Sequence, residues 1–203
     1  VVSNITRLNG LKKKILEGGM EKFHVISDFD RTLTKAYVDG EKTPSVISEL
    51  RKRNYIDEDY SKEAQKLADK YHPIEINPNV SQEKKKKAMH EWWSKHFDLL
   101  IESGLNRRHI KEVVDSGRIQ FREGAKEFFD YLYGNKIPLV VLSSSGLGSD
   151  SIRMMLDKED SLYNNIHVIS NEFKWDKNGK ALAVKEPIIH GMNKDETAVK
   201  NYP

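Results

Sequence analysis

The 203-residue sequence contains no cysteine, which excludes a disulfide framework, a thiolate metal site and a cysteine nucleophile. It also lacks a signal-peptide pattern and any apolar run near the roughly 18 residues that a membrane-spanning helix needs. Neither sign of charge dominates, because 34 Lys and Arg residues stand against 31 Asp and Glu residues. We therefore expect a cytoplasmic monomer that has neither a membrane nor a nucleic-acid polymer as a partner.

Apolar patterning predicts an α/β protein. A helix around Leu8–Leu16 is followed by a short buried strand at 23–26. After residue 122 the α/β pattern returns, with parallel strands expected at 137–142 and 166–169. A hairpin is expected over 173–184, turning near Asn178-Gly179.

The segment 38–121 differs from its flanks because it is lysine-rich, helical in period and poor in strand signals. Helical spacing of apolar residues continues on both sides of a candidate helix cap at Ser81. Pro73 and Pro78 lie between these helical stretches and predict extended or turn backbone there.

Two aspartates follow the first predicted strand. Asp28 and Asp30 can turn together into the crevice beyond the carboxyl ends of parallel strands. One carboxylate can attack phosphorus, and the other can protonate the leaving oxygen and later deprotonate water. Because two anions repel a phosphate, the pair requires a hard cation such as Mg²⁺. For an isolated Asp-x-Asp, the alternative is a solvated turn at a strand end.

A turn rich in serine and glycine follows the second predicted strand. There, the hydroxyl of Ser144 and the backbone N–H groups near Gly146 and Gly148 can form a phosphate cradle. Such turns are also common as plain loops. Lys194 is a candidate cation to balance the phosphate, with ordinary surface charge as the alternative.

Together these residues resemble the cytosolic 5′-nucleotidase III family of the haloacid-dehalogenase phosphatase superfamily. This family comprises pyrimidine 5′-nucleotidase and the 7-methylguanosine phosphate-specific nucleotidase. The resemblance implies a Rossmann-like parallel-sheet core with an inserted helical cap. The implied division is 1–37 and 122–203 for the core and 38–121 for the cap. The similar stretches occur in family order at 27–34, 70–78, 89–95, 122–124, 137–139, 144–148, 168–171 and 189–194.

The resemblance also implies roles for individual residues. Asp28 would be the nucleophile and Asp30 the general acid and base, and the Asp28 carboxylate and Asp30 carbonyl would hold Mg²⁺. The phosphate-binding residues that it implies are Ser144, Ser145, Gly146 and Lys194, with Ser143 as the alternative to Ser144.

Four cap residues are implied to read the base. Glu75 would accept hydrogen bonds from a base amino or ring N–H group, although a surface glutamate is the alternative. Trp92 and Trp93 offer a stacking platform, and a tryptophan pair is more typical of the methylguanylate type, whose cationic base gains cation–π attraction. Because adjacent helical residues point about 100° apart, only one tryptophan is expected to face the substrate. His96, one turn beyond Trp92, can line the same face.

The family's Gly-Asp-x-x-Gly-Asp motif, which supplies a further Mg²⁺ ligand, does not occur in this sequence. We expect it beyond Pro203, in a longer protein of which this chain is a piece. The expected function is Mg²⁺-dependent hydrolysis of nucleoside 5′-monophosphates, namely CMP, UMP or 7-methyl-GMP. The alternatives are a related phosphatase for another small phosphomonoester and a nucleotide-binding protein that has lost turnover.

Overall fold

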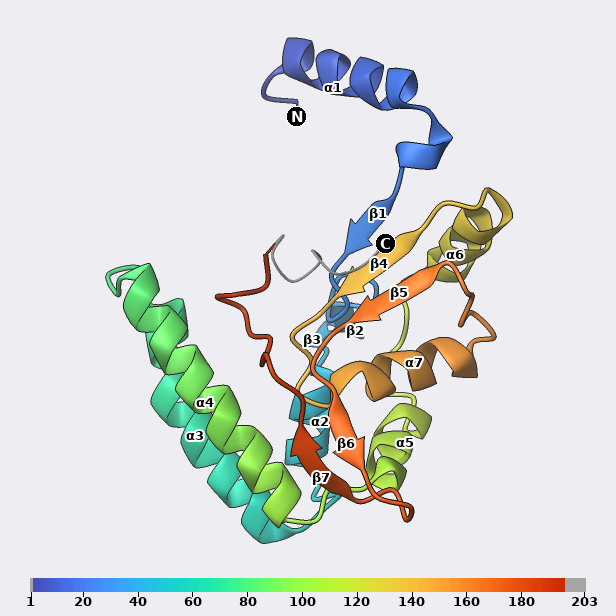
Figure 1. Cartoon of the computed structure of the whole chain (residues 1–203). Coiled ribbons are helices and arrows are strands. Elements are labelled where there is room, and N and C mark those ends of the chain that lie inside the picture. The colour runs from blue at the N-terminus through green and yellow to red at the C-terminus, as the bar shows by residue number, and fades with distance from the viewer. Residues whose placement is uncertain (1, 196–203) are drawn as a thin grey trace.

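A sheet of three parallel strands forms the centre of the computed structural model, which describes residues 2–195 (Figure 1). β1 (Val25–Ser27) pairs with β4 (Leu139–Leu142), and β4 pairs with β5 (Ile166–Ile169). Every residue of β4 is buried, as its continuous apolar run predicts for a central parallel strand. The parallel strands bring the loops that start at Asp28 and Ser143 to one edge of the sheet.

Two helices cover this sheet. α6 (Ala125–Gly134) precedes β4 and buries Phe129 and Leu132, and α7 (Gly148–Lys158) connects β4 to β5 and buries Ile152 and Leu156. The buried side chains of both helices belong to the main hydrophobic core together with those of β4. The predicted α/β class with a parallel sheet is therefore confirmed.

Four helices lie in the segment 38–121. The longest two, α3 (Glu58–Ile76) and α4 (Gln82–Glu102), form a packed pair that extends away from the sheet (Figure 1, teal and green). Ser81 caps α4 as predicted, because its Oγ accepts a hydrogen bond from Lys84 N at 3.4 Å. The other two helices are α2 (Val46–Lys52) and α5 (Arg107–Asp115).

The expectation of extended backbone around Pro73 is wrong. Helix α3 continues through Pro73 and ends at Ile76, and Pro78 lies beyond its end. Proline near a helix end removes a single backbone donor. Packing offsets this loss, because Tyr71 is 1% exposed and stacks on Trp92 of α4 with ring centroids 5.9 Å apart.

Three small elements and an N-terminal helix complete the described chain. The hairpin of β6 (Phe173–Trp175) and β7 (Ala181–Val184) was predicted, whereas the hairpin of β2 (Tyr37–Val38) and β3 (Glu41–Lys42) was not. Helix α1 (Ile5–Gly18) has no buried residue and is joined to β1 through the short 3-10 helix η1 (Met20–Lys22) (Figure 1). No helix within residues 2–195 has the length and apolar character needed to cross a bilayer.

Candidate active site

The carboxyl end of β1 carries Asp28, the predicted nucleophile. Its side chain is 43% exposed, and its Oδ1 accepts a hydrogen bond from Phe29 N at 2.8 Å. The same oxygen lies 2.5 Å from Nζ of Lys194, which comes from the other end of the described chain. Folding therefore brings together the carboxylate and the cation that the sequence predicted for phosphate chemistry.

Asp30, two residues further on, is half-buried beneath the start of α2. Its Oδ1 accepts a hydrogen bond from Val46 N at 3.3 Å. Burial raises the pKa of Asp30 to about 6, and the nearby Asp28 charge adds to the rise, while the Val46 hydrogen bond opposes it. A carboxyl with this pKa can carry a proton near neutral pH and donate it to a leaving group.

The triple-serine turn after β4 distributes its three hydroxyls differently. The Oγ of Ser143 is buried and accepts from Ser145 N at 3.2 Å, and the Oγ of Ser145 accepts from Leu147 N and pairs with Ser151 Oγ, both at 3.3 Å. Ser144 is half-buried and makes no hydrogen bond to any residue of the described range 2–195. This geometry favours Ser144 over Ser143 as the hydroxyl available to a phosphate.

The turn at residues 143–148, which we call the phosphate loop, is held by Asn171 against the segment that carries Lys194, a role that the sequence analysis did not predict. Its Nδ2 donates to Ser145 O at 3.2 Å and to Ile189 O at 2.9 Å, and its Oδ1 accepts from Ile189 N at 2.8 Å. Asn171 is 1% exposed. The sequence did carry a signal, because Asn171, whose amide both donates and accepts, lies two residues after the end of the third parallel strand.

Two glycines let the phosphate loop approach its neighbours. Gly148 has φ +69°, and a Cβ there would lie 2.5 Å from the carbonyl oxygen of Asn171. A Cβ on Gly146 would lie 2.7 Å from Cζ3 of Trp93 on α4. The predicted phosphate loop therefore packs directly against a predicted base-binding residue.

A cavity of about 540 Å³ lies among helices α2, α3 and α4; we call it the cap cavity. All four residues predicted to bind the base line it, together with residues from α2, α3 and the segment after Asp30. The lining residues are Arg31, Lys42, Ser45, Ile47, Ser48, Arg51, Gln65, Ala68, Asp69, His72, Pro73, Glu75, Trp92, Trp93 and His96.

Both tryptophans line the cap cavity, although helical geometry led us to expect only one facing the substrate. Their ring centroids are 5.9 Å apart with an interplanar angle of 20°. Long side chains allow rings from adjacent residues to turn onto one another, so backbone direction alone does not fix where they point. Tyr71 extends the stack on the other side of Trp92.

His96 and Glu75 occupy different environments in the cap cavity. His96 is 2% exposed, and burial, aided by the charge of Arg51, lowers its pKa to about 3, so the ring is neutral. The carboxylate of Glu75 lies 3.2 Å from Nδ1 of His72. A Cβ on Gly191 would lie 3.5 Å from Glu75 Oε1, so Glu75 reaches the segment that carries Lys194.

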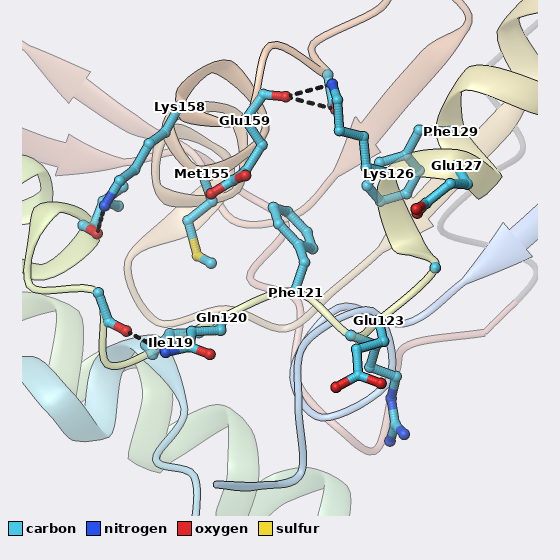
Figure 2. A pocket seen from close by; sticks show the side chains of 15 residues that line it. Ile119, Gln120, Phe121, Glu123, Lys126, Glu127, Phe129, Met155, Lys158 and Glu159 are labelled. Atoms are coloured by element: carbon cyan, nitrogen blue, oxygen red, sulfur yellow. Dashed lines mark hydrogen bonds between the residues drawn. The ribbon is translucent and has the colours of Figure 1, made fainter.

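A second cavity, of about 480 Å³, lies among α5, α6 and α7 and contains none of the predicted site residues (Figure 2). Both lysines that line it donate hydrogen bonds to backbone carbonyls. Lys126 Nζ donates to Glu159 O at 2.9 Å, and Lys158 Nζ donates to Val114 O at 3.0 Å. These cations are already paired, so the cap cavity is the better candidate site.

The described residues fit part of a Mg²⁺ site. Asp28 and Asp30 offer carboxylate and carbonyl oxygens, the ligands that Mg²⁺ prefers. Within residues 2–195, both hydrogen bonds of the Asp28 side chain use Oδ1, which leaves Oδ2 for a bond to the metal. Residues 2–195 contain no group of three or more His, Cys, Asp or Glu side chains arranged to hold a metal. The further aspartate expected beyond Pro203 lies outside the described residues.

The parallel sheet and the helices that cover it give the chain a haloacid-dehalogenase-type fold. A HAD-family hydrolase from Salmonella enterica serovar Typhi has the same fold, with a TM-score of 0.57 at 12% identity, covering 97% of this chain and 60% of that one. Within this class, the chain belongs to the family described as pyrimidine 5′-nucleotidase (UMPH-1), whose model matches residues 31–203.

Two relatives are similar along almost the whole chain. The human 7-methylguanosine phosphate-specific 5′-nucleotidase is 34% identical over 195 residues, covering 96% of this chain and 64% of its own length. The crystal structure of cytosolic 5′-nucleotidase IIIB bound to cytidine is 28% identical with a TM-score of 0.84, covering 97% of this chain and 65% of that one. The chain thus spans just under two thirds of the length of these relatives.

Proposed function

We propose that this protein hydrolyses nucleoside 5′-monophosphates to nucleoside and phosphate. The observation that carries the proposal is the direct packing of the phosphate loop, at Gly146, against Trp93, which lines the cap cavity. One bound molecule with a phosphate at one end and an aromatic base at the other would fill both sites. The family membership and the nucleotidase activities for which the relatives are named support the same substrate class.

The proposed first step uses Asp28 and Asp30. A carboxylate oxygen of Asp28 attacks the phosphorus in line, the bond from phosphorus to O5′ breaks, and Asp30 gives its proton to O5′ of the departing nucleoside. Lys194 and Ser144 would hold the phosphoryl oxygens while negative charge develops on them. The product of this step is an aspartyl-phosphate on Asp28.

The second step reverses the role of Asp30. The Asp30 carboxylate, now deprotonated, takes a proton from a water molecule, whose oxygen attacks the phosphorus and breaks its bond to Asp28. This releases inorganic phosphate and restores both carboxyl groups. The Asp28 carboxylate and Asp30 carbonyl would hold Mg²⁺, which when bound neutralises charge between the carboxylates and the phosphate.

The cap cavity would select the base. The Glu75 carboxylate can accept hydrogen bonds from an amino or ring N–H group, and Trp92 and Trp93 supply stacking surfaces. Pyrimidine nucleotides and 7-methyl-GMP both meet these requirements. The division into core and cap at residues 37/38 and 121/122, the monomeric state and a cytoplasmic location stay predictions.

A substrate panel tests this function. Phosphate release would be followed for CMP, UMP, 7-methyl-GMP and phosphoserine, each with Mg²⁺ and with excess chelator. We expect Mg²⁺-dependent release from one or more nucleotides and far slower release from phosphoserine, which has no base to stack. Equal rates for phosphoserine would point to a general phosphatase. Binding of nucleotides without phosphate release would point to a binding protein.

A further inference from the structure

Arg51 brings into the cap cavity a charged group that the proposed chemistry does not use. Helix α2 starts at the catalytic carboxylates, because Val46 N bonds to Asp30 Oδ1. Arg51 follows five residues later and shares the cavity-facing side of α2 with Ile47 and Ser48, four and three residues before it. At 1.5 Å per residue, Arg51 lies about 7 Å further along the axis, where the base of a nucleotide would extend.

The guanidinium of Arg51 has no partner among the residues that the structure describes. Its Nε is buried without a hydrogen bond, and the side chain forms no hydrogen bond or ion pair with any residue described from 2 to 195. The nearby carboxylates of the cavity are already engaged: Asp69 accepts from Gln65 Nε2 at 2.6 Å, and Glu75 lies 3.2 Å from His72 Nδ1. A buried N–H group without a partner is rare in folded proteins and calls for a ligand or water.

The charge of Arg51 acts inside the cavity rather than at its outer surface. It contributes, after burial, to the lowered pKa of His96, and it opposes the burial that raises the pKa of Tyr60. Tyr60 and His96 are 1% and 2% exposed. The Trp93 ring lies edge-on against His96, with centroids 5.6 Å apart. The positive charge of Arg51 therefore acts on the buried His96, against which Trp93 packs, at the inner end of the aromatic surface on which a base would stack.

We propose that Arg51 determines base specificity by donating a hydrogen bond to a carbonyl oxygen of the base. The inference rests on the proposed nucleotidase function. Cytosine, uracil and 7-methylguanine each offer a carbonyl oxygen, whereas adenine offers none. A cavity with a donor in Arg51 and an acceptor in Glu75 binds a base that carries both a carbonyl oxygen and an N–H group. Adenine would leave the guanidinium unpaired, which costs affinity.

The test compares two ligands and three proteins. Dissociation constants would be measured by titration calorimetry, in excess chelator to prevent hydrolysis, for CMP and 2-thio-CMP, in which sulfur replaces the only carbonyl oxygen of the base. The proteins are the wild type, Arg51→Met and Lys52→Met. Methionine keeps an unbranched chain without donors. Lys52 is exposed on the same helix and does not line the cap cavity, so Lys52→Met matches the loss of charge.

We expect the wild type and Lys52→Met to bind CMP about tenfold more tightly than 2-thio-CMP, because a hydrogen bond from a charged donor to oxygen is lost. Arg51→Met should bind both ligands with the weaker affinity. The proposal would be overturned if Arg51→Met kept the preference for CMP. It would also be overturned if the wild type did not distinguish the two ligands, and this second result does not depend on the folding of any variant. A wild type that binds no nucleotide at all would instead overturn the nucleotidase function.

Discussion

The two ends of the candidate site are built differently. At the phosphate end, Asp28 and Asp30 are held by backbone N–H groups within hydrogen-bond distance, and Asn171 ties the adjoining loops together through backbone carbonyls. At the base end, side chains from three helices face a cavity and meet mainly through ring stacking and long, flexible groups. The phosphate end is therefore fixed by the main chain, and the base end by side-chain packing.

This difference in construction matches two different tasks, the reaction at the phosphate end and the choice of base at the base end. A reacting group must be held to a fraction of an ångström, which backbone anchors at strand ends can do. A base pocket needs only complementary surfaces and a few hydrogen bonds. Substitutions at the phosphate end should therefore change the rate for every substrate, whereas substitutions at the base end should change the rate for nucleotides alone.

Asp28→Asn should have the largest effect on activity. The amide is isosteric with the carboxylate but cannot attack phosphorus, so we expect hydrolysis of CMP and of p-nitrophenyl phosphate to fall by about four orders of magnitude. Steady-state phosphate release measures this. Asp39→Asn makes the same change at an exposed position in the β2–β3 turn and should leave the rate unaltered. Substantial turnover by Asp28→Asn would rule out Asp28 as the nucleophile.

Acid should destabilise the base end through His96. Its folded pKa of about 3 lies below the ordinary 6.5, so the unfolded chain binds a proton that the folded protein excludes. The contribution of neutral His96 to the free energy of unfolding is complete above pH 6.5 and declines as the pH falls towards 3. At pH 4.5 the loss in this free energy is roughly 2–3 kcal/mol.

Urea unfolding at pH 7.5 and 4.5 checks the His96 prediction. His96→Phe keeps an aromatic ring without a titrating group, so its stability should fall less between the two pH values. His190 also has a pKa lowered by burial, to about 4, so part of the acid loss should survive in His96→Phe. Identical losses in the wild type and the variant would show that His96 is not the acid-labile group.

Sequence patterning predicted the strands and turns around the phosphate end well because these elements depend on local order. The strand expected at 166–169 matches β5, and the turn expected near Gly179 has the positive φ of +77° that favours glycine. The strand expected at 23–26 is shifted to Val25–Ser27, because pairing with β4 decides which residues join the sheet. Asp28, Ser144 and Lys194 all lie at or beside the expected sheet edge.

The base end was less predictable because its elements depend on distant partners. Helix α2 has only seven residues, and its first N–H is capped by Asp30, sixteen residues earlier. The straight passage of α3 through Pro73 depends on the packing of Tyr71 against α4. No local pattern marks Arg51 as a cavity residue, since it is one cation among many until tertiary folding buries its Nε.

Glu75→Ala should change nucleotide hydrolysis selectively. Removing an acceptor for base N–H groups should reduce kcat/KM for CMP by about thirtyfold, while hydrolysis of p-nitrophenyl phosphate, which has no such group, stays unchanged. The control is Glu63→Ala, on the same helix but exposed and paired with Lys66. Equal losses on both substrates would mean that Glu75 supports the phosphate end rather than the base.

The smallest change in activity is expected for Ser144, and it is measured by comparison with the neighbouring Ser143. Ser144 forms no hydrogen bond with the described part of the chain. Ser144→Ala should therefore lower kcat/KM by about tenfold on CMP and p-nitrophenyl phosphate alike, with an unchanged free energy of unfolding. Ser143 is buried and accepts from Ser145 N, so Ser143→Ala should lose about 1 kcal/mol of stability. The reverse result would make Ser143 the phosphate ligand. Because each serine is the control for the other, one pair of variants separates a substrate contact from a structural hydrogen bond one residue away.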